Sequence, residues 1–403
     1  MRLGTEIDLA YCTNIHRGDT WEETFAGLAR YTDEVRRRVA GDQPYGIGLR
    51  LSARAAATLT ADRSLRDDFR RWMDERNAYL FTINGFPYGT FHGSRVKEQV
   101  YAPDWTTPER LSYTERLFTL LDEWAEPGRA ISVSTLPGSF KEFFSGGTEE
   151  ESWSAMLGQV RACADFLARL GESSGRDVHL GFEPEPLGLF ENTPETVAFF
   201  ERLTEGATAA GRERCLRHLG VNYDTCHFAL QFEDPQEALG TFRREGIRIS
   251  KVHLSSALGL TPGPDSLEEL RAFQDDVYLH QVLVRKGDAV VRRFRDLPDA
   301  LAWAETAEEL GEEWRVHFHV PLHADLAEPF SDTREHITGL LRHLAEEPGW
   351  CGHFEMETYT WEVLPEAIRS RDVVDQLVAE YDWCLRKFAE AGFNRKRKME
   401  TSP

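Results

Sequence analysis

The sequence lacks the usual marks of a secreted or disulfide-bonded protein. Its N-terminal stretch, residues 1–8, has no apolar core and contains acidic residues, so we expect no export signal. The six cysteines form no C-x-x-C pair, which argues against a zinc ribbon and against a disulfide framework. A reducing cytoplasm is the simplest setting for such a chain.

Long hydrophobic runs and an excess of positive charge are also missing. No apolar run approaches the roughly 18–20 residues that cross a bilayer, so we expect no membrane span. The formal net charge is −21, and because phosphate backbones are bound by basic surfaces, we expect no nucleic-acid partner. No G-x-G-x-x-G or G-x-x-x-x-G-K-[ST] motif follows a predicted strand, which removes the usual reason to expect an open nucleotide-binding sheet.

The chain does contain a regular alternation of strand-like and helix-like segments across its 403 residues. Helical spacing predicts helices over 21–39, 107–123, 149–170, 193–204, 235–244, 265–272, 297–310, 332–345 and 373–391, and a helical region that follows the strand at 45–51 and runs through Arg76. Nine runs are predicted as strands: 7–13, 45–51, 79–84, 130–135, 178–182, 219–223, 247–254, 314–320 and 353–361. Two further runs, 278–285 and 289–294, flank a predicted β-hairpin turn at 286–288.

Repeated βα units predict a parallel sheet, either open or closed as a barrel. The absence of nucleotide-binding motifs favours the α/β (β/α)₈ TIM barrel with elaborated loops. Nine strands are one too many, so either 314–320 or the last run lies outside the barrel, or an early prediction is wrong. We expect a single domain over 1–393 and a polar, disordered tail over 394–403.

The most informative stretch is L-G-V-N-Y-D-T-C-H-F-A at 219–229. An apolar run leads into Asp224, and His227 follows three residues later. A strand followed by a loop or helical turn would place this carboxylate beside this imidazole, a pair of ligands that suits a divalent ion. The alternative is that Asp224 caps the next helix and His227 is a buried histidine with ordinary hydrogen bonds.

Other predicted strands also end in residues that can bind a metal. Because strand ends converge at one mouth of a barrel, we expect these side chains to meet there: Glu183, Asp224 with His227, His253, His319, and Glu355 or Glu357. Such a mixture of oxygen and nitrogen ligands suits one divalent ion, Mn²⁺, Mg²⁺, Co²⁺ or Zn²⁺, with open positions for substrate. His317 and His319 point the same way on a strand, so both could face the mouth. Alternatively, one of them is buried and hydrogen-bonded to the backbone.

These motifs resemble the xylose-isomerase-like TIM-barrel superfamily, through Glu183-Pro184, Asp224-Thr225-Cys226-His227, Val252-His253-Leu254 and Glu357-Thr358. That group includes ketose epimerases, inosose-type dehydratases and isomerases, and type IV apurinic endonucleases. The resemblance implies four metal ligands, Glu183, Asp224, His253 and Glu357, with His227 at the substrate or at a second metal.

The sequence departs from this pattern in one segment. Simple epimerases have nothing equivalent to the run with His317 and His319, so His319 is a candidate to replace or supplement His253 as a ligand. His280 lies roughly where the nucleases place a further metal ligand.

Longer runs resemble the EboE family, known as metabolite traffic proteins, over nearly the whole chain. They are Y-C-T-N-I-H (11–16), N-G-F-P-Y-G (84–89), E-P-E-P (183–186), H-F-H-V-P (317–321) and E-T-Y-T-W (357–361). The resemblance implies a bacterial gene cluster that makes or exports a small metabolite, with other proteins of that cluster as partners. The sequence also allows a homo-oligomer.

We therefore expect an isomerase, epimerase or dehydratase that acts on a polyhydroxylated, sugar- or cyclitol-like small molecule. Glu183, Glu357 and His227 are the expected catalytic groups. The expected substrate-binding residues are His227, His280, His317, His319, Tyr88 and Trp361; for the aromatic ones the alternative is packing of a loop on the barrel. Two other functions stay open, a zinc-dependent phosphodiester hydrolase and a protein that binds and hands on a metabolite without catalysis.

Overall fold

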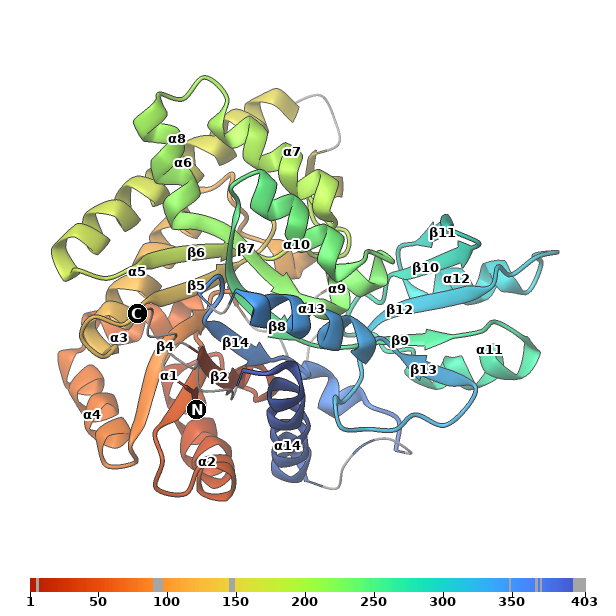
Figure 1. Ribbon diagram of the computed structural model, residues 1–403, viewed down its shortest axis with the longest axis horizontal. Coiled ribbons are helices and arrows are strands. Elements are labelled where there is room, and N and C mark those ends of the chain that lie inside the picture. The colour runs from red at the N-terminus through yellow and green to blue at the C-terminus, as the bar shows by residue number, and fades with distance from the viewer. Residues whose placement is uncertain are drawn as a thin grey trace, which may run out of the picture.

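The computed structural model describes residues 1–4, 7–89, 97–144, 149–347, 349–366, 369 and 372–393. Its larger sheet has the order β1-β2-β14-β8-β7-β6-β5-β4-β3, in which β1 (Arg2–Leu3) is antiparallel to β2 and the other neighbours are parallel (Figure 1). The parallel strands are β2 (Ile7–Tyr11), β3 (Tyr45–Arg50), β4 (Ala78–Asn84), β5 (Ile131–Thr135), β6 (Val178–Phe182), β7 (Leu219–Asp224), β8 (Arg248–Leu254) and β14 (His353–Met356). A parallel bridge between Cys12 and Gly48 joins the two ends of the sheet. The predicted (β/α)₈ TIM barrel is therefore confirmed.

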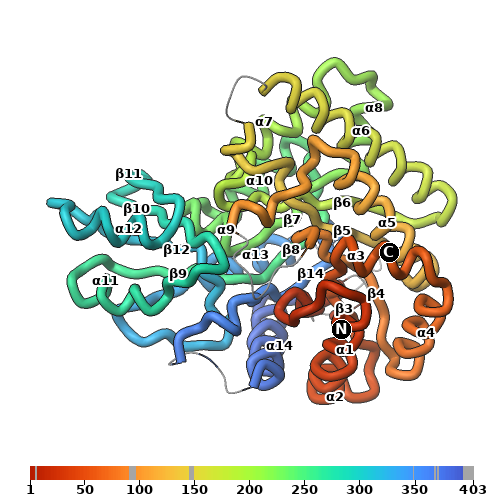
Figure 2. Tube along the Cα trace, turned by 180° about the vertical axis from the view of Figure 1, so that it is seen from behind, coloured from red at the N-terminus to blue at the C-terminus, as the bar shows by residue number. Residues whose placement is uncertain are grey.

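The barrel strands are buried on both faces, which is why their sequences show runs rather than alternation. Every residue of β6 and of β7 is buried. Helices cover the outside of the barrel (Figure 2), namely α1 (Trp21–Gly27), α2 (Asp33–Val39), α3 (Ala53–Ala61), α4 (Arg63–Asp74), α5 (Pro108–Trp124), α6 (Glu149–Ser174), α7 (Thr193–Thr204), α8 (Ala209–His218), α10 (Pro235–Arg244), α13 (Arg334–Glu346) and α14 (Val373–Ala391).

Local signals in the sequence explain where these helices begin. The Thr20 hydroxyl accepts a hydrogen bond from the Glu23 amide at 3.2 Å, and the Glu23 carboxylate accepts one from the Thr20 amide at 3.0 Å, a reciprocal cap at the start of α1. Asn192 and Asp234 cap α7 and α10, each of which has a proline in its first turn. The predicted helix over 21–39 is present as α1, a π-helical turn (Leu28–Thr32) and α2. Helix α8 was not predicted.

A second, antiparallel sheet lies outside the barrel and projects from one end of it (Figures 1 and 2). We call it the appended sheet; its order is β11 (Ala289–Phe294), β10 (Val282–Lys286), β12 (Glu313–His319), β9 (Ala257–Leu260) and β13 (Phe330–Asp332), and it packs with α11 (Pro264–Leu270) and α12 (Leu297–Ala304). The ninth predicted strand, 314–320, is β12, so it is the one that lies outside the barrel.

Two strand predictions were partly wrong. The hairpin turn at 286–288 is confirmed, but its first strand begins only at Val282. The last barrel strand ends at Met356 rather than at residue 361, and a 3-10 turn, Tyr359–Val363, follows it. At Met356 the chain reaches the mouth of the barrel and leaves the sheet. Sequence periodicity does not show where a strand reaches the mouth.

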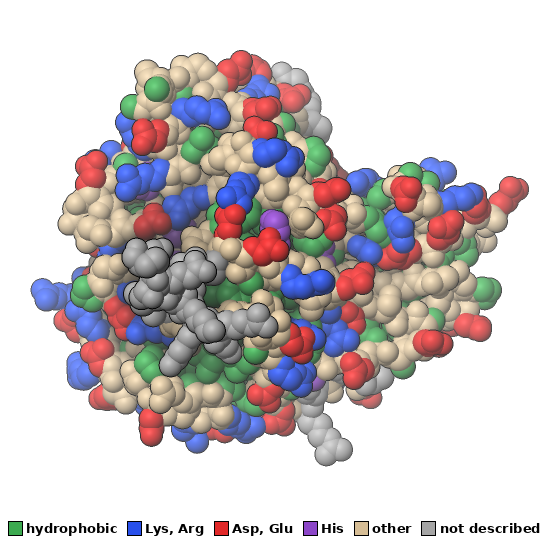
Figure 3. Space-filling model, in the orientation of Figure 1, with side chains coloured by type: hydrophobic (Ala, Val, Ile, Leu, Met, Phe, Trp, Pro, Cys, Tyr) green, Lys and Arg blue, Asp and Glu red, His purple; other side chains and the backbone are tan. Residues whose placement is uncertain are grey.

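Separate hydrophobic clusters fill the barrel and the appended sheet, and Trp361 packs against both of them. Acidic and basic side chains are interspersed over the face drawn in Figure 3, so the net negative charge is not gathered into one patch there. In the described part of the chain, no helix is long and apolar enough to cross a membrane. The single domain over 1–393 stays a prediction, and the tail predicted at 394–403 lies outside the described residues.

Closure of the barrel depends on the lack of a side chain at Gly48. A Cβ at this position would lie 2.5 Å from the Tyr11 carbonyl oxygen and would overlap the carboxylate of Glu355. We expect Gly48→Ala to destabilise the fold by about 1–3 kcal/mol, as overpacking of a core does. Thermal unfolding measures the change. As a control, Gly158→Ala in α6 meets no atom within 4 Å and should leave stability equal or raised by about 0.5–1 kcal/mol. Equal melting temperatures for Gly48→Ala and wild type would contradict this account.

Candidate metal centre

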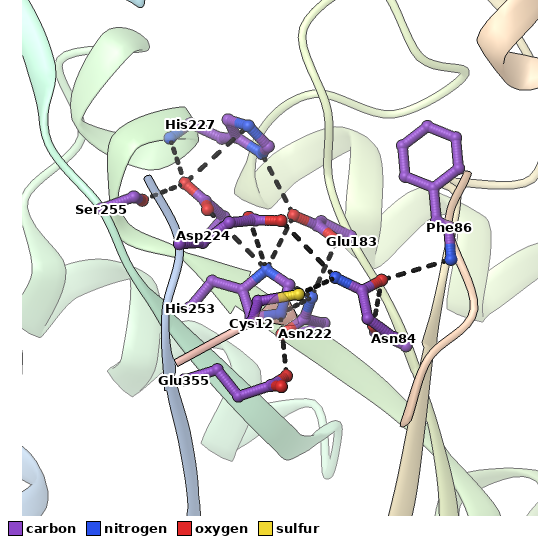
Figure 4. Close-up of polar contacts among 12 residues, drawn as sticks. Cys12, Asn84, Phe86, Glu183, Asn222, Asp224, His227, His253, Ser255 and Glu355 are labelled. Carbon is purple, nitrogen blue, oxygen red and sulfur yellow. Dashed lines mark hydrogen bonds and ion pairs between the residues drawn. The ribbon is translucent and has the colours of Figure 1, made fainter. Parts of the chain in front are cut away.

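Four buried side chains meet at the carboxyl ends of the barrel strands. Glu183 follows β6, Asp224 ends β7, His253 lies near the end of β8 and Glu357 follows β14. Each offers one ligand atom, and these four atoms lie within 4.8 Å of one another. Strand register produces this meeting, because His253 pairs with Asp224 on one side and with Glu355 on the other. Figure 4 shows Glu183, Asp224 and His253 turned toward one another.

Each of the three carboxylates has one oxygen held by a protein donor. The Asn222 amide donates to Oε2 of Glu183 at 2.9 Å, and the Asn14 amide donates to Oε1 of Glu357 at 2.6 Å. Oδ1 of Asp224 accepts from the backbone amide of His227 at 3.0 Å and from the Ser255 hydroxyl at 2.6 Å, two donors that hold the carboxylate in place.

The second oxygen of each carboxylate is directed at the shared point. Oε1 of Glu183 and Oε2 of Glu357 lie 3.1 and 2.8 Å from Nδ1 of His253. Oδ2 of Asp224 is buried without a hydrogen-bond partner among the described residues. Three aimed carboxylate oxygens and one imidazole form a donor set that fits a divalent first-row ion or Mg²⁺.

A buried ion pair beneath the cluster orients His253. The Lys251 ammonium contacts the Glu355 carboxylate, and both side chains are fully buried. Oε2 of Glu355 lies 3.3 Å from Nε2 of His253. Burial alone would raise the pKa of Glu355, but Lys251 lowers it to about 2, so the carboxylate is ionised. An ionised carboxylate beside Nε2 of His253 places the proton of the neutral ring on that nitrogen. Nδ1 is then left for a metal ion.

Burial and the neighbouring charged groups together set the pKa values of the clustered side chains. Burial raises the pKa of Asp224, but neighbouring imidazoles, His227 first among them, bring it down to about 2. Burial lowers the pKa of His253, yet Glu357 and Glu183 outweigh that effect and hold it well above its ordinary value. Without a cation, the imidazole therefore carries a proton that offsets the buried carboxylates. A divalent ion would supply that positive charge instead.

Three histidines form a layer above the four ligands. His227 Nε2 lies 3.1 Å from His317 Nε2, while Nδ1 of His227 donates to the Pro184 carbonyl at 2.8 Å. His319 donates from Nδ1 to the Glu357 carbonyl at 2.8 Å, which leaves its buried Nε2 without a partner among the described residues. His317 and His319 come from β12 of the appended sheet, so that sheet completes the mouth of the barrel.

A pocket opens onto this cluster. Glu183, Glu357, His227 and His317 line it, whereas Asp224 and His253 are not among its lining residues. Glu185, also in the lining, lies 3.8 Å from Nε2 of His227, and burial raises the pKa of its carboxyl well above the ordinary value. The pocket side of the cluster thus carries groups that can give and take protons.

Four of the predicted substrate-binding residues, His280, His319, Tyr88 and Trp361, are not among the lining residues of this pocket. Both ring nitrogens of His280 are used, since Nδ1 bonds to the His317 carbonyl at 2.7 Å and Nε2 contacts Asp275. Tyr88 packs on Tyr113 with ring centroids 4.9 Å apart, and Trp361 packs between the two hydrophobic clusters. For both aromatic residues the packing alternative describes what is seen.

The sequence analysis did not identify the residues that hydrogen-bond or orient the candidate metal-binding side chains. Asn222 and Lys251 each lie two positions before a predicted ligand, so the period of a strand places them on the same face as Asp224 and His253. That spacing was available in the sequence. The roles of Asn14, Ser255 and Glu185 depend on contacts between distant segments, for which the sequence has no comparable sign.

Comparison with known proteins supports the fold. No family profile and no curated protein sequence matches the chain. A xylose isomerase domain protein from Alicyclobacillus acidocaldarius subsp. acidocaldarius has 12% identity, a TM-score of 0.50, and alignment over 96% of this chain and 99% of its own. The probable 3-DHS dehydratase AsbF of petrobactin synthesis from Bacillus anthracis has 12% identity, a TM-score of 0.46 and coverage of 94% and 99%. The IOLI protein with a bound zinc atom has 10% identity, a TM-score of 0.45 and coverage of 96% and 99%. The fold is thus a xylose isomerase-like TIM barrel, and the closer resemblance to EboE is not confirmed.

Glu380 of α14 makes the region beside Glu357 sensitive to pH. Its carboxyl is buried and accepts from the Thr358 hydroxyl at 2.8 Å and the Leu322 amide at 3.0 Å. Burial raises its pKa from 4.5 to about 7. Because the pKa is higher in the folded protein, the stabilisation from this group is full below pH 4.5 and is lost as the pH rises through about 7.

Glu380→Gln keeps an acceptor oxygen and cannot ionise, so it should remove this loss. We expect the variant to gain on wild type as the pH rises from 4.5 to above 8, by roughly 3 kcal/mol in the free energy of unfolding. Melting temperatures at pH 5 and pH 8.5 test this. Asp382→Asn, at an exposed position on the same helix, is the control and should show no such trend. A constant difference between Glu380→Gln and wild type would contradict the assignment.

Proposed function

We propose that the protein is a divalent-metal-dependent enzyme that moves a proton beside a carbonyl group of a small molecule, as isomerases, epimerases and dehydratases do. The observation that carries the proposal is the set of four ligand atoms within 4.8 Å, with three carboxylates that each keep one oxygen directed to the same point. A cation held there would act as a Lewis acid on neighbouring substrate oxygens.

The residues on the pocket side have distinct proposed roles. Glu183 and Glu357 line the pocket and can take a proton from a substrate carbon bound beside them. His227 lines the pocket and is oriented by its bond to the Pro184 carbonyl, so its ring can pass a proton to or from a substrate oxygen. The partly buried carboxyl of Glu185 can act as an acid, because its pKa is raised well above the ordinary value.

A second candidate is a phosphodiester hydrolase with more than one zinc ion. It is favoured by two further groups of potential ligands: Asp224 with His227 and His319, which shares Asp224 with the first group, and Glu185 with His227 and His317. The unpartnered Nε2 of His319 fits such a site. The bacterial gene cluster, its other proteins as partners, the homo-oligomer and the cytoplasmic location stay predictions.

Metal content is the direct test. We expect protein purified without added metal, or loaded afterwards, to hold about one equivalent of a divalent ion. Asp224→Asn and Glu357→Gln should each weaken metal binding tenfold or more, because each removes an aimed ligand oxygen. Elemental analysis of the dialysed proteins measures this.

Asp104→Asn is the matched control for these variants. Asp104 is a buried carboxylate outside the cluster that accepts hydrogen bonds from Thr106 and Ser139, so the control should keep the metal. Two or three zinc equivalents in wild type would favour the hydrolase. No metal under any loading condition would leave a barrel that binds a metabolite without this chemistry.

A further inference from the structure

The pocket above the candidate metal centre is too small for a metabolite in this structure. Its volume is about 60 Å³, whereas pockets that hold small-molecule ligands usually measure about 300–1,000 Å³. A sugar-sized molecule can therefore enter only if part of the wall moves. The segment that is held least firmly is the one that can do so.

One segment of the wall, Lys97–Tyr101, is a short 3-10 helix between β4 and α5, and we call it the flap. Lys97, Val100 and Tyr101 line the pocket, but of the five flap residues only Tyr101 is buried. Short, largely exposed segments with few buried apolar side chains are the parts of a fold that open at the lowest free energy.

Hydrogen bonds to the backbone hold other parts of the wall more firmly. The segment with Leu187 is fixed by its carbonyl, which accepts from the Lys141 amide at 3.0 Å. The loop before β10 is fixed by the Asp275 carboxylate, which accepts from the amides of Val277 and Tyr278 at 2.7 and 2.9 Å. Both segments are therefore poorer candidates for movement than the flap.

Ion pairs join the flap to the connection between β11 and α12 of the appended sheet. The Lys97 ammonium donates to the Asp296 carboxylate at 2.6 Å, and the Glu98 carboxylate lies 3.1 Å from the Arg295 guanidinium. Asp296 is itself fixed in place, because it caps α12 and its other oxygen accepts from the His280 amide at 3.0 Å.

The pair of Lys97 with Asp296 holds the flap more strongly than the pair of Glu98 with Arg295. Its side chains are 14% and 10% exposed, against 38% and 41% in the second pair, and exposed ion pairs contribute little to stability. Lys97 also has a φ of +34°, which is unfavourable for a residue with a side chain. Loss of the ion pair would let this backbone relax away from the closed arrangement.

We infer that the flap is the entrance to the pocket and that the ion pair between Lys97 and Asp296 is the latch that keeps it closed. The appended sheet then controls access to the pocket as well as lining it. The inference concerns access alone, so it does not depend on which ligand or metal ion the site holds.

A cysteine placed in the pocket measures how often the flap opens. The six native cysteines are buried, and Gln281, which lines the pocket, is 2% exposed. In full-length Gln281→Cys, a thiol reagent can reach the new side chain only when the pocket opens. The labelling rate in an excess of reagent therefore follows the population of the open form, and we expect it to be far slower than in the unfolded protein.

Variants of Lys97 in the same background test the latch. Lys97→Met keeps an unbranched side chain but removes the charge, so it should raise the labelling rate about fivefold or more. Lys97→Arg keeps a cation beside Asp296 and should restore slow labelling. The matched control is Lys286→Met, which breaks an ion pair with Glu309 elsewhere in the appended sheet and should leave the rate unchanged.

Hydrogen–deuterium exchange of the full chain separates opening of the flap from general unfolding. The Lys97 amide donates to the Val277 carbonyl at 3.2 Å and the Ala102 amide to the Gln99 carbonyl at 3.1 Å, so both report on the flap. In Lys97→Met, exchange should rise in the peptide that covers 97–102 and stay unchanged in the barrel strands. An equal rise in the barrel strands would overturn the inference. So would equal labelling rates with and without Lys97→Met, or labelling of Gln281→Cys as fast as in the unfolded protein.

Discussion

Three carboxylates that share one buried point at the barrel mouth constrain everything around them. At an effective dielectric constant near 20, two unit charges 4.8 Å apart repel each other by about 3 kcal/mol, and the cluster contains three such pairs. Glu183, Asp224 and Glu357 could not remain ionised there without compensation. Hydrogen-bond donors and protonated imidazoles provide part of it in the protein alone, and a divalent cation would provide it at a single position. The geometry is therefore that of a site built around a positive charge.

The layer beneath the cluster explains how the ligands are kept in one arrangement. Lys251 neutralises Glu355, and Glu355 in turn fixes the ring of His253, so the charge needed to orient the histidine is itself compensated. The carboxylate of Glu355 fits only because Gly48 has no side chain. One glycine on β3 thus serves both the closure of the barrel and the placing of a ligand on β8.

Much of the barrel could be predicted from sequence, as could the meeting of the candidate ligands at its mouth, and the reasons are physical. Buried parallel strands leave uninterrupted apolar runs, and a polar residue at the end of such a run marks the mouth, as with Glu183 and Asp224. The residues alone left Glu355 and Glu357 open, because the two lie two positions apart, and only the resemblance selected Glu357; in the structure Lys251 engages Glu355. His280 and Trp361 have the right chemistry for a site, but hydrogen bonds and packing to distant segments take them away from it.

The appended sheet contributes side chains and hydrogen bonds directly to the candidate metal centre. β9 begins three residues after β8 ends, and in that short crossover Ser255 donates to Asp224 and accepts from the amide of Cys226 at 2.9 Å. β12 then returns from the same sheet to place His317 and His319 over the ligands. The wall that would select a substrate and the cluster that would react with it therefore share strands and hydrogen bonds. Because a rigid element positions groups more accurately than a loop, this arrangement favours a site whose specificity and chemistry are set together.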